Sequence, residues 1–123
     1  MMTLKNIPDQ VVGPLTQTDL VKYQGASGDF NAIHHDPVGA AARGQRVISP
    51  GMFQAGLMDT WLAEATEGAA VARLAVRFLA PACVGDTLTI TGGLADDGSG
   101  EIEIRCMNGE GVVLVSGRAT LAS

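Results

Sequence analysis

The fold of this chain depends most on one segment, which reads SPGMFQAGLMDTWL and spans residues 49–62. It opens with a serine able to cap a helix and a proline suited to the first helical position. Apolar residues then occupy nearly every helical angle, and only three polar side chains interrupt them: Gln54, Asp59 and Thr60. A helix that is apolar almost all round must be buried on most sides. We therefore expect a central helix with the rest of the chain packed around it.

After Gly68 the periodicity of the apolar residues changes from helical to alternating. Around residues 71–78 and 101–106 every second side chain is apolar, which is typical of half-buried antiparallel strands. Two more strands and three turns complete a meander of about four strands: strands at 87–91 and 112–121, and turns at 81–86, 95–100 and Asn108-Gly109. One buried helix against such a sheet predicts an α+β fold, with the sheet curled around the helix in a hot-dog-like arrangement.

Before the central helix, the sequence predicts a short extended start and two helices joined by a loop. The segment Thr16-Gln17-Thr18-Asp19 has the residues of an N-cap, so a first helix should begin there and end in the turn at residues 25–28. Asp36-Pro37 supplies the cap and first residue of a two-turn helix that ends at Gly44. Residues 29–35 therefore begin on a loop between two helices.

The length and composition favour one domain, residues 1–123. Eight Lys and Arg against 13 Asp and Glu give a net charge of −5, which repels nucleic acid phosphates and anionic membrane surfaces. The start has no apolar leader segment, and no stretch approaches the roughly 20 apolar residues of a membrane-spanning helix. We expect a cytoplasmic protein that binds neither nucleic acid nor a membrane.

Both histidines of the chain, His34 and His35, lie within six residues of Asp29 and Asn31. A neutral imidazole can donate and accept a hydrogen bond near neutral pH, and a carboxylate supplies a fixed negative acceptor. Together they can hold a water molecule and move its proton. A second candidate feature is Gly51, because the first N–H groups of a helix have no intrahelical acceptor and can meet a developing oxyanion.

Each of these residues also has a purely structural interpretation. An Asp after Gly is commonly a turn residue, and a buried His is more often a satisfied core group than a catalyst. A metal site at His34-His35-Asp36 is disfavoured, because adjacent residues rarely point at one ion and no further His completes a ligand set. Cys83 and Cys106 lack CxxC spacing and are expected to be reduced packing residues.

The stretch SGDFNAIHHDP, residues 27–37, resembles the hydratase motif of the MaoC-like dehydratases, a family that includes the (R)-specific enoyl-CoA hydratases. That motif reads roughly S-G-D-x-N-P-hydrophobic-H-x-D. The resemblance continues in order along nearly the whole chain: Gly51-Met52, residues 77–81, residues 84–86 and residues 117–119.

The resemblance implies a hot-dog fold and the hydration of a trans-2-enoyl-CoA to an (R)-3-hydroxyacyl-CoA, or the reverse reaction. Asp29 and His34 would activate the water that attacks C3, and Asn31 would order the loop and help to bind the substrate. The start of the central helix would bind the substrate through four residues: Ser49, Pro50, Gly51 and Met52. No metal and no cofactor is implied beyond the coenzyme A of the substrate. The implied partners are a second copy, in a homodimer or higher homo-oligomer, or a second hot-dog subunit.

Two positions depart from the family: Ala32 replaces the usual Pro after the motif Asn, and Pro50 replaces a His that often precedes Gly-Met. Two alternatives therefore stay open. One is a non-catalytic or half-catalytic subunit of a heteromeric hydratase, and the other is a hot-dog thioesterase that uses Asp59 or Glu64. The candidates for binding the CoA phosphates are Arg43, Arg46 and Arg73.

Overall fold

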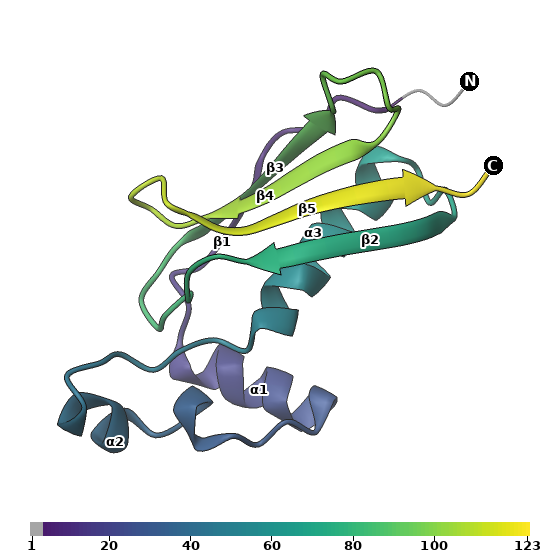
Figure 1. The fold of residues 1–123 in the computed structure, drawn as a ribbon. Coiled ribbons are helices and arrows are strands. Elements are labelled where there is room, and N and C mark those ends of the chain that lie inside the picture. Colours follow the sequence, from purple (N-terminus) through teal and green to yellow (C-terminus); the bar gives the residue numbers. More distant parts are fainter. Residues whose placement is uncertain (1–3) are drawn as a thin grey trace.

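The computed structural model describes residues 4–123. It shows a five-stranded antiparallel sheet that curls over one long helix, α3 (Figure 1). The strands lie in the order β1-β3-β4-β5-β2. In chain order the elements are β1 (Gln10–Val12), α1 (Gln17–Ser27), a 3-10 turn (Ala32–His34), α2 (Pro37–Ala42), α3 (Gly51–Ala65), β2 (Val71–Phe78), β3 (Leu88–Leu94), β4 (Ile102–Met107) and β5 (Val113–Leu121). This is the predicted α+β arrangement of a sheet around a central helix.

The core lies between α3 and the inner face of the sheet. Met58, Trp61 and Leu62 of α3 are buried there against sheet residues such as Ile104 and Val115. Two strand glycines let the helix approach closely. A Cβ atom on Gly92 would lie 2.7 Å from Cη2 of Trp61, and one on Gly117 would lie 2.8 Å from Cε of Met58.

The alternation predicted for residues 101–106 is present in the structure. In β4, Ile102, Ile104 and Cys106 are buried, and Glu103 and Arg105 between them are exposed. The alternation predicted for residues 71–78 is wrong: on the edge strand β2, residues 71–73 and 77–78 are exposed and residues 74–76 are half-buried. The sheet also has a fifth strand, β1, where the sequence indicated only an extended start. Its three residues pair with β3, and a segment that short carries no readable periodicity.

Both helices before α3 begin where their caps were predicted. Thr16 and Asp19 form a reciprocal capping box at the start of α1, and Gly28 ends this helix with φ at 79°. The Asp36 carboxylate accepts a hydrogen bond from Gly39 N (2.9 Å) at the start of α2. A small second core of Leu20, Ala40 and Val47 joins these helices to the loop before α3.

The predicted start of α3 was wrong by one residue. Pro50, not Ser49, is the N-cap, because its φ of −57° and ψ of 130° keep it extended, and no side chain caps the helix. The Ser49 hydroxyl instead donates to Gln54 Oε1 (3.0 Å). Gln54, which the sequence placed among the polar interruptions of the helix, is therefore turned inward and buried.

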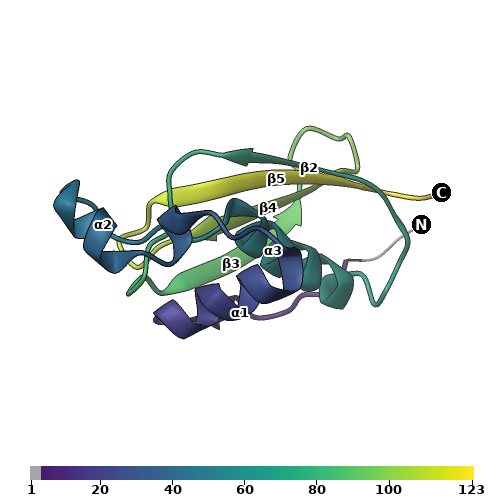
Figure 2. The ribbon, with the colours of Figure 1, turned by 90° about the horizontal axis from the view of Figure 1, so that it is seen from below.

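The helices α1 and α2 gather at the end of the sheet from which α3 starts (Figures 1 and 2). They bring the loop of residues 28–36 to the N-terminus of α3, because Ile48 N donates to Ile33 O (3.1 Å). Among residues 4–123, no helix combines the length and apolar character needed to cross a bilayer.

Candidate active site

The loop of residues 28–36 is held by its own side chains and by α1. Asp29 Oδ1 accepts from Asn31 N, and Asn31 Oδ1 accepts from Ile33 N, each at 3.2 Å. The buried amide of Gln24 on α1 donates to the carbonyl oxygens of Asp29 (3.0 Å) and Asn31 (3.1 Å). These bonds fix the loop backbone although most of the loop is exposed.

His34 lies at the centre of the site with its side chain 8% exposed. Its Nδ1 is 2.6 Å from Ile48 O. Because a carbonyl oxygen only accepts, Nδ1 carries the proton, and Nε2 of the neutral ring is an acceptor. That Nε2 lies 3.7 Å from Asp29 Oδ2, and the Asp29 side chain is 56% exposed.

His34 Nε2 and Asp29 Oδ2 face each other. Because both are acceptors while His34 is neutral, no direct hydrogen bond joins them. A water molecule between them can donate one proton to each, which leaves its lone pairs free for an electrophile. The geometry therefore suits activation of a water by the pair Asp29 and His34.

A pocket of about 520 Å³ opens beside His34. It is lined by Ile33, His34, Ile48, Ser49, Gly51, Met52, Gln54, Phe78, Leu79, Ala80 and Pro81. Its volume lies in the range of small-molecule sites, which is about 300–1,000 Å³. Its walls are mainly apolar, and Gly51 at the first position of α3 adds an N–H without an intrahelical acceptor.

The structure brings together most of the residues predicted for the site. His34, Ser49, Gly51 and Met52 line the pocket, and Asp29 lies within 3.7 Å of His34. The Asn31 side chain is bonded within the loop, where its Oδ1 accepts from Ile33 N. Pro50 is buried at the N-cap and does not line the pocket.

The sequence did not predict Gln24, which holds the loop, or seven residues of the pocket lining: Ile33, Ile48, Gln54, Phe78, Leu79, Ala80 and Pro81. Gln54 did carry a signal, because a polar side chain that interrupts an apolar helix near its N-terminus can face a site as well as solvent. The positions of Gln24 and Phe78 depend on tertiary packing and have no local signal.

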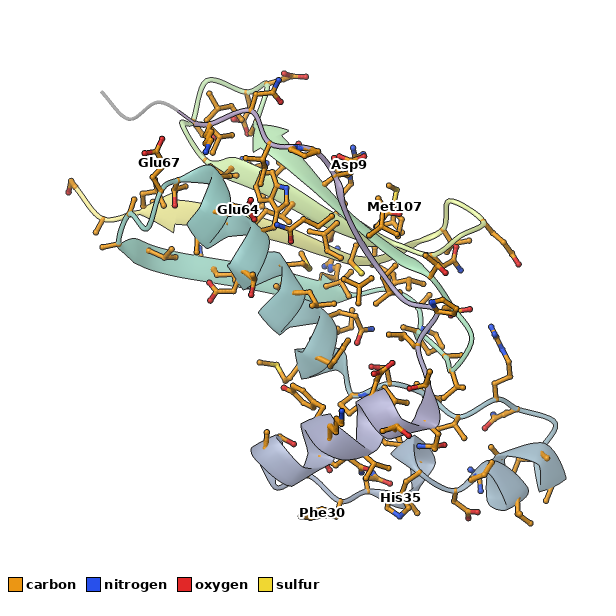
Figure 3. The ribbon with its side chains drawn as sticks, turned by 180° about the vertical axis from the view of Figure 1, so that it is seen from behind. Asp9, Phe30, His35, Glu64, Glu67 and Met107 are labelled. Atoms are coloured by element: carbon orange, nitrogen blue, oxygen red, sulfur yellow. The ribbon has the colours of Figure 1, made fainter. Side chains whose placement is uncertain are left out.

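The carboxylates proposed for a thioesterase lie away from the pocket. Asp59 is exposed on α3, and Glu64 accepts from Gln10 Nε2 (2.5 Å). Figure 3 shows Glu64 near one end of α3, far from His35 and Phe30 of the motif loop. Neither carboxylate lines the pocket that holds His34.

A second hollow of about 520 Å³ lies on the outer face of the sheet, over Arg77, Arg105 and Ser116. It has no His, and the nearby Arg118 is paired with Asp97 (2.8 Å). Of the two hollows, the pocket at α3 is the one lined by a histidine. Of the arginines considered for phosphates, Arg46 pairs with Asp86 (3.1 Å), and Arg43 and Arg73 are exposed.

Comparisons with known proteins agree with this fold. The model of the MaoC like domain family matches residues 3–115. An (R)-hydratase from A. caviae involved in PHA biosynthesis has a TM-score of 0.80 at 24% identity, over 96% of this chain and 94% of that one. The R-hydratase PhaJ1 from Pseudomonas aeruginosa has a TM-score of 0.80 at 22% identity, over 98% and 81%.

A third similar structure is the ChsH1-ChsH2 complex from Mycobacterium tuberculosis, with a TM-score of 0.77 at 20% identity, over 99% of this chain and 98% of that one. At these identities the three structures establish the shared hot-dog fold. A comparison with curated proteins returned no match.

Proposed function

This chain belongs to the family of proteins with a MaoC like domain, and we propose that it adds water reversibly to a trans-2-enoyl-CoA. The product is an (R)-3-hydroxyacyl-CoA. The observation that supports this reaction most is the facing pair of acceptors, His34 Nε2 and Asp29 Oδ2, 3.7 Å apart. The pair stands beside a pocket whose floor includes the N-terminus of α3.

The reaction needs only the groups of this site and one water. The water held by the pair attacks C3 of the enoyl group, and one of its protons passes to the pair. The electrons of the C2–C3 double bond move toward the thioester, whose carbonyl oxygen gains charge and is stabilised by Gly51 N–H. The proton held by the pair then passes to C2, so that both side chains return to their starting state. Dehydration follows the same steps in reverse.

The acyl chain fits the apolar walls of the pocket. Five aliphatic or aromatic side chains supply them: Ile33, Ile48, Met52, Phe78 and Leu79. Several of these are exposed to solvent at the mouth, with Met52 at 61% and Leu79 at 53%. An apolar wall that is open to water in one chain is incomplete as a binding site for an acyl group.

A partner subunit is therefore part of the proposal. Strand β2 is an edge of the sheet, so its outer backbone groups can pair with another strand. Phe78 at the end of β2 is half exposed beside the pocket. We propose that a second hot-dog unit covers this edge, either a copy of this chain or a related subunit, as the ChsH1-ChsH2 complex joins two named components.

Two alternatives follow from the same fold. A subunit that is inactive alone would account for the exposed apolar residues of the pocket. It would not explain why Asp29 and His34 face each other. A thioesterase is less well supported, because Asp59 and Glu64 do not reach the pocket.

The proposed activity is tested with crotonyl-CoA and the purified chain. Loss of enoyl absorbance without release of free thiol, and an (R) product, would support hydration. Asp29→Asn and His34→Gln should each lower its rate by about 100-fold or more, and Asp59→Asn, which changes an exposed carboxylate on α3, should have no effect. Thiol release with unchanged enoyl absorbance would instead support the thioesterase. Activity only after addition of a co-purifying subunit would support the heteromer.

A further inference from the structure

Gln54 is the most deeply buried polar side chain of the pocket. It lies in the first turn of α3 with 2% of its surface exposed, and it lines the pocket together with His34 and Gly51. A primary amide at a mainly apolar wall is costly unless its hydrogen-bonding groups are paired. Both ends of the amide, Oε1 and Nε2, therefore need hydrogen-bonding partners.

The acceptor end of the amide is occupied. The single proton of the Ser49 hydroxyl is shared between Gln54 Oε1 (3.0 Å) and Pro50 O (3.2 Å), and Ser49 is itself anchored by its N–H, which donates to Ala82 O (2.8 Å). Both side chains are buried. This bond orients the amide and leaves Nε2 as the free end.

The donor end has no protein partner among residues 4–123. Trp61 Nε1 is the one completely buried side-chain donor in that part of the chain that lacks a partner. Gln54 Nε2 also lacks a partner, so it is not completely buried and keeps some exposed surface. Because Gln54 lines the pocket and is otherwise covered, that surface faces the pocket. The pocket therefore contains an oriented N–H donor.

Gln54 and Gly51 share one side of α3. Residues three apart lie on the same face of a helix, and helical side chains lean toward the N-terminus. The Nε2 of Gln54 is thus directed toward the end of the pocket where Gly51 presents its N–H. We propose that Gln54 Nε2 is the second donor, beside Gly51 N–H, to the thioester carbonyl oxygen.

This role rests on the proposed hydration, in which that oxygen gains negative charge as water adds to C3. A donor aimed at such an oxygen stabilises the transition state more than the ground state. Loss of one oxyanion donor lowers kcat by about 100-fold to 1,000-fold in comparable sites. The ligand class that Gln54 recognises is thus the carbonyl of an enoyl thioester.

The test compares Gln54→Leu and Gln54→Glu with Gln45→Leu, which changes an exposed glutamine that does not line the pocket. Leu removes the amide, and an ionised Glu can still accept from Ser49 but cannot donate. Both changes at Gln54 should lower kcat by about 100-fold or more with little change in KM, and Gln45→Leu should be neutral. An unchanged KM shows that each variant is folded and binds substrate, so the loss of kcat is not a folding defect.

A spectroscopic readout separates this proposal from the proposed function. The carbonyl stretch of ¹³C-labelled crotonyl-CoA, bound to the Asp29→Asn variant, should lie at lower frequency with Gln54 present than with Gln54→Leu. This shift needs no turnover, so it tests Gln54 even if the chain alone does not hydrate the thioester. An unchanged carbonyl frequency, or a rise in KM with wild-type kcat, would overturn the role of Gln54.

Discussion

Phe78 and Gly51 are packed so tightly that a Cβ atom on residue 51 would lie 2.8 Å from Cε1 of the Phe78 ring. The ring forms the wall of the pocket over the first N–H of α3. Only glycine at position 51 allows the ring to lie this close. The contact brings the end of β2 and the proposed oxyanion donor, Gly51 N–H, into one site.

Gly51→Ala should therefore impair catalysis more than stability. The half-exposed Phe78 ring can swing aside, so we expect the free energy of unfolding to change by no more than about 1 kcal/mol. The displaced ring narrows the pocket, and kcat/KM should fall about 100-fold. The matched control is Gly56→Ala on the same helix, where an added Cβ meets nothing within 4 Å. A fall in activity as large for Gly56→Ala would contradict this interpretation.

Alanine substitutions at Gly92 and at its neighbour Gly93 test how closely α3 packs on the sheet. A Cβ atom on Gly92 would lie 2.6 Å from Glu103 O and 2.7 Å from Trp61 Cη2, and one on Gly93 meets nothing within 4 Å. Gly92→Ala should lower the free energy of unfolding by about 1–3 kcal/mol. Gly93→Ala should stay within about 0.5 kcal/mol of wild type. Urea denaturation of both variants measures the difference, and equal stabilities would show that the helix is not in contact at Gly92.

Gln24→Leu should loosen the catalytic loop. The change removes the amide that donates to the carbonyl oxygens of Asp29 and Asn31 and whose Oε1 lies 3.0 Å from His35 Nδ1. Buried polar groups left without partners cost about 1–3 kcal/mol, so stability should fall by that order. Hydrogen exchange of residues 28–35 should become faster, whereas Lys22→Leu, on an exposed position of α1, should leave it unchanged.

Cys106 gives the protein a pH-dependent loss of stability under alkaline conditions. Burial raises the pKa of its thiol to about 11, above the value of about 8.5 of a free thiol. Between those two values the unfolded chain loses the proton and the folded chain keeps it, so stability falls as pH rises. Cys106→Ala should therefore lose less stability than wild type between neutral pH and about pH 10. Equal losses in urea denaturation would show that this thiol does not contribute.

Much of the fold was predictable because its signals are local. The capping residues Thr16, Asp19 and Asp36 act within one turn, and the alternation of Ile102, Ile104 and Cys106 directly reflects the two faces of a strand. The loop motif likewise predicted the pair Asp29 and His34, which the structure brings to 3.7 Å.

The remaining features depend on contacts between distant segments. Ser49 has the chemistry of a cap, but the extended Pro50 moves the helix start, and the hydroxyl bonds Gln54 instead. Gln24 faces the loop only because α1 packs beside it. Strand β1 exists because β3 offers a free edge to pair with.

The joint action of Asp29 and His34 on one water is the core of the proposed mechanism. A double-mutant cycle on crotonyl-CoA hydration tests it most directly, with Asp29→Asn, His34→Gln and the double variant in whichever assembly is active. Each single change should lower kcat by about 100-fold to 10,000-fold, and the double variant should lose little more, since either change already disables the shared water. A wild-type rate in either single variant, or losses that multiply in the double variant, would contradict the claim.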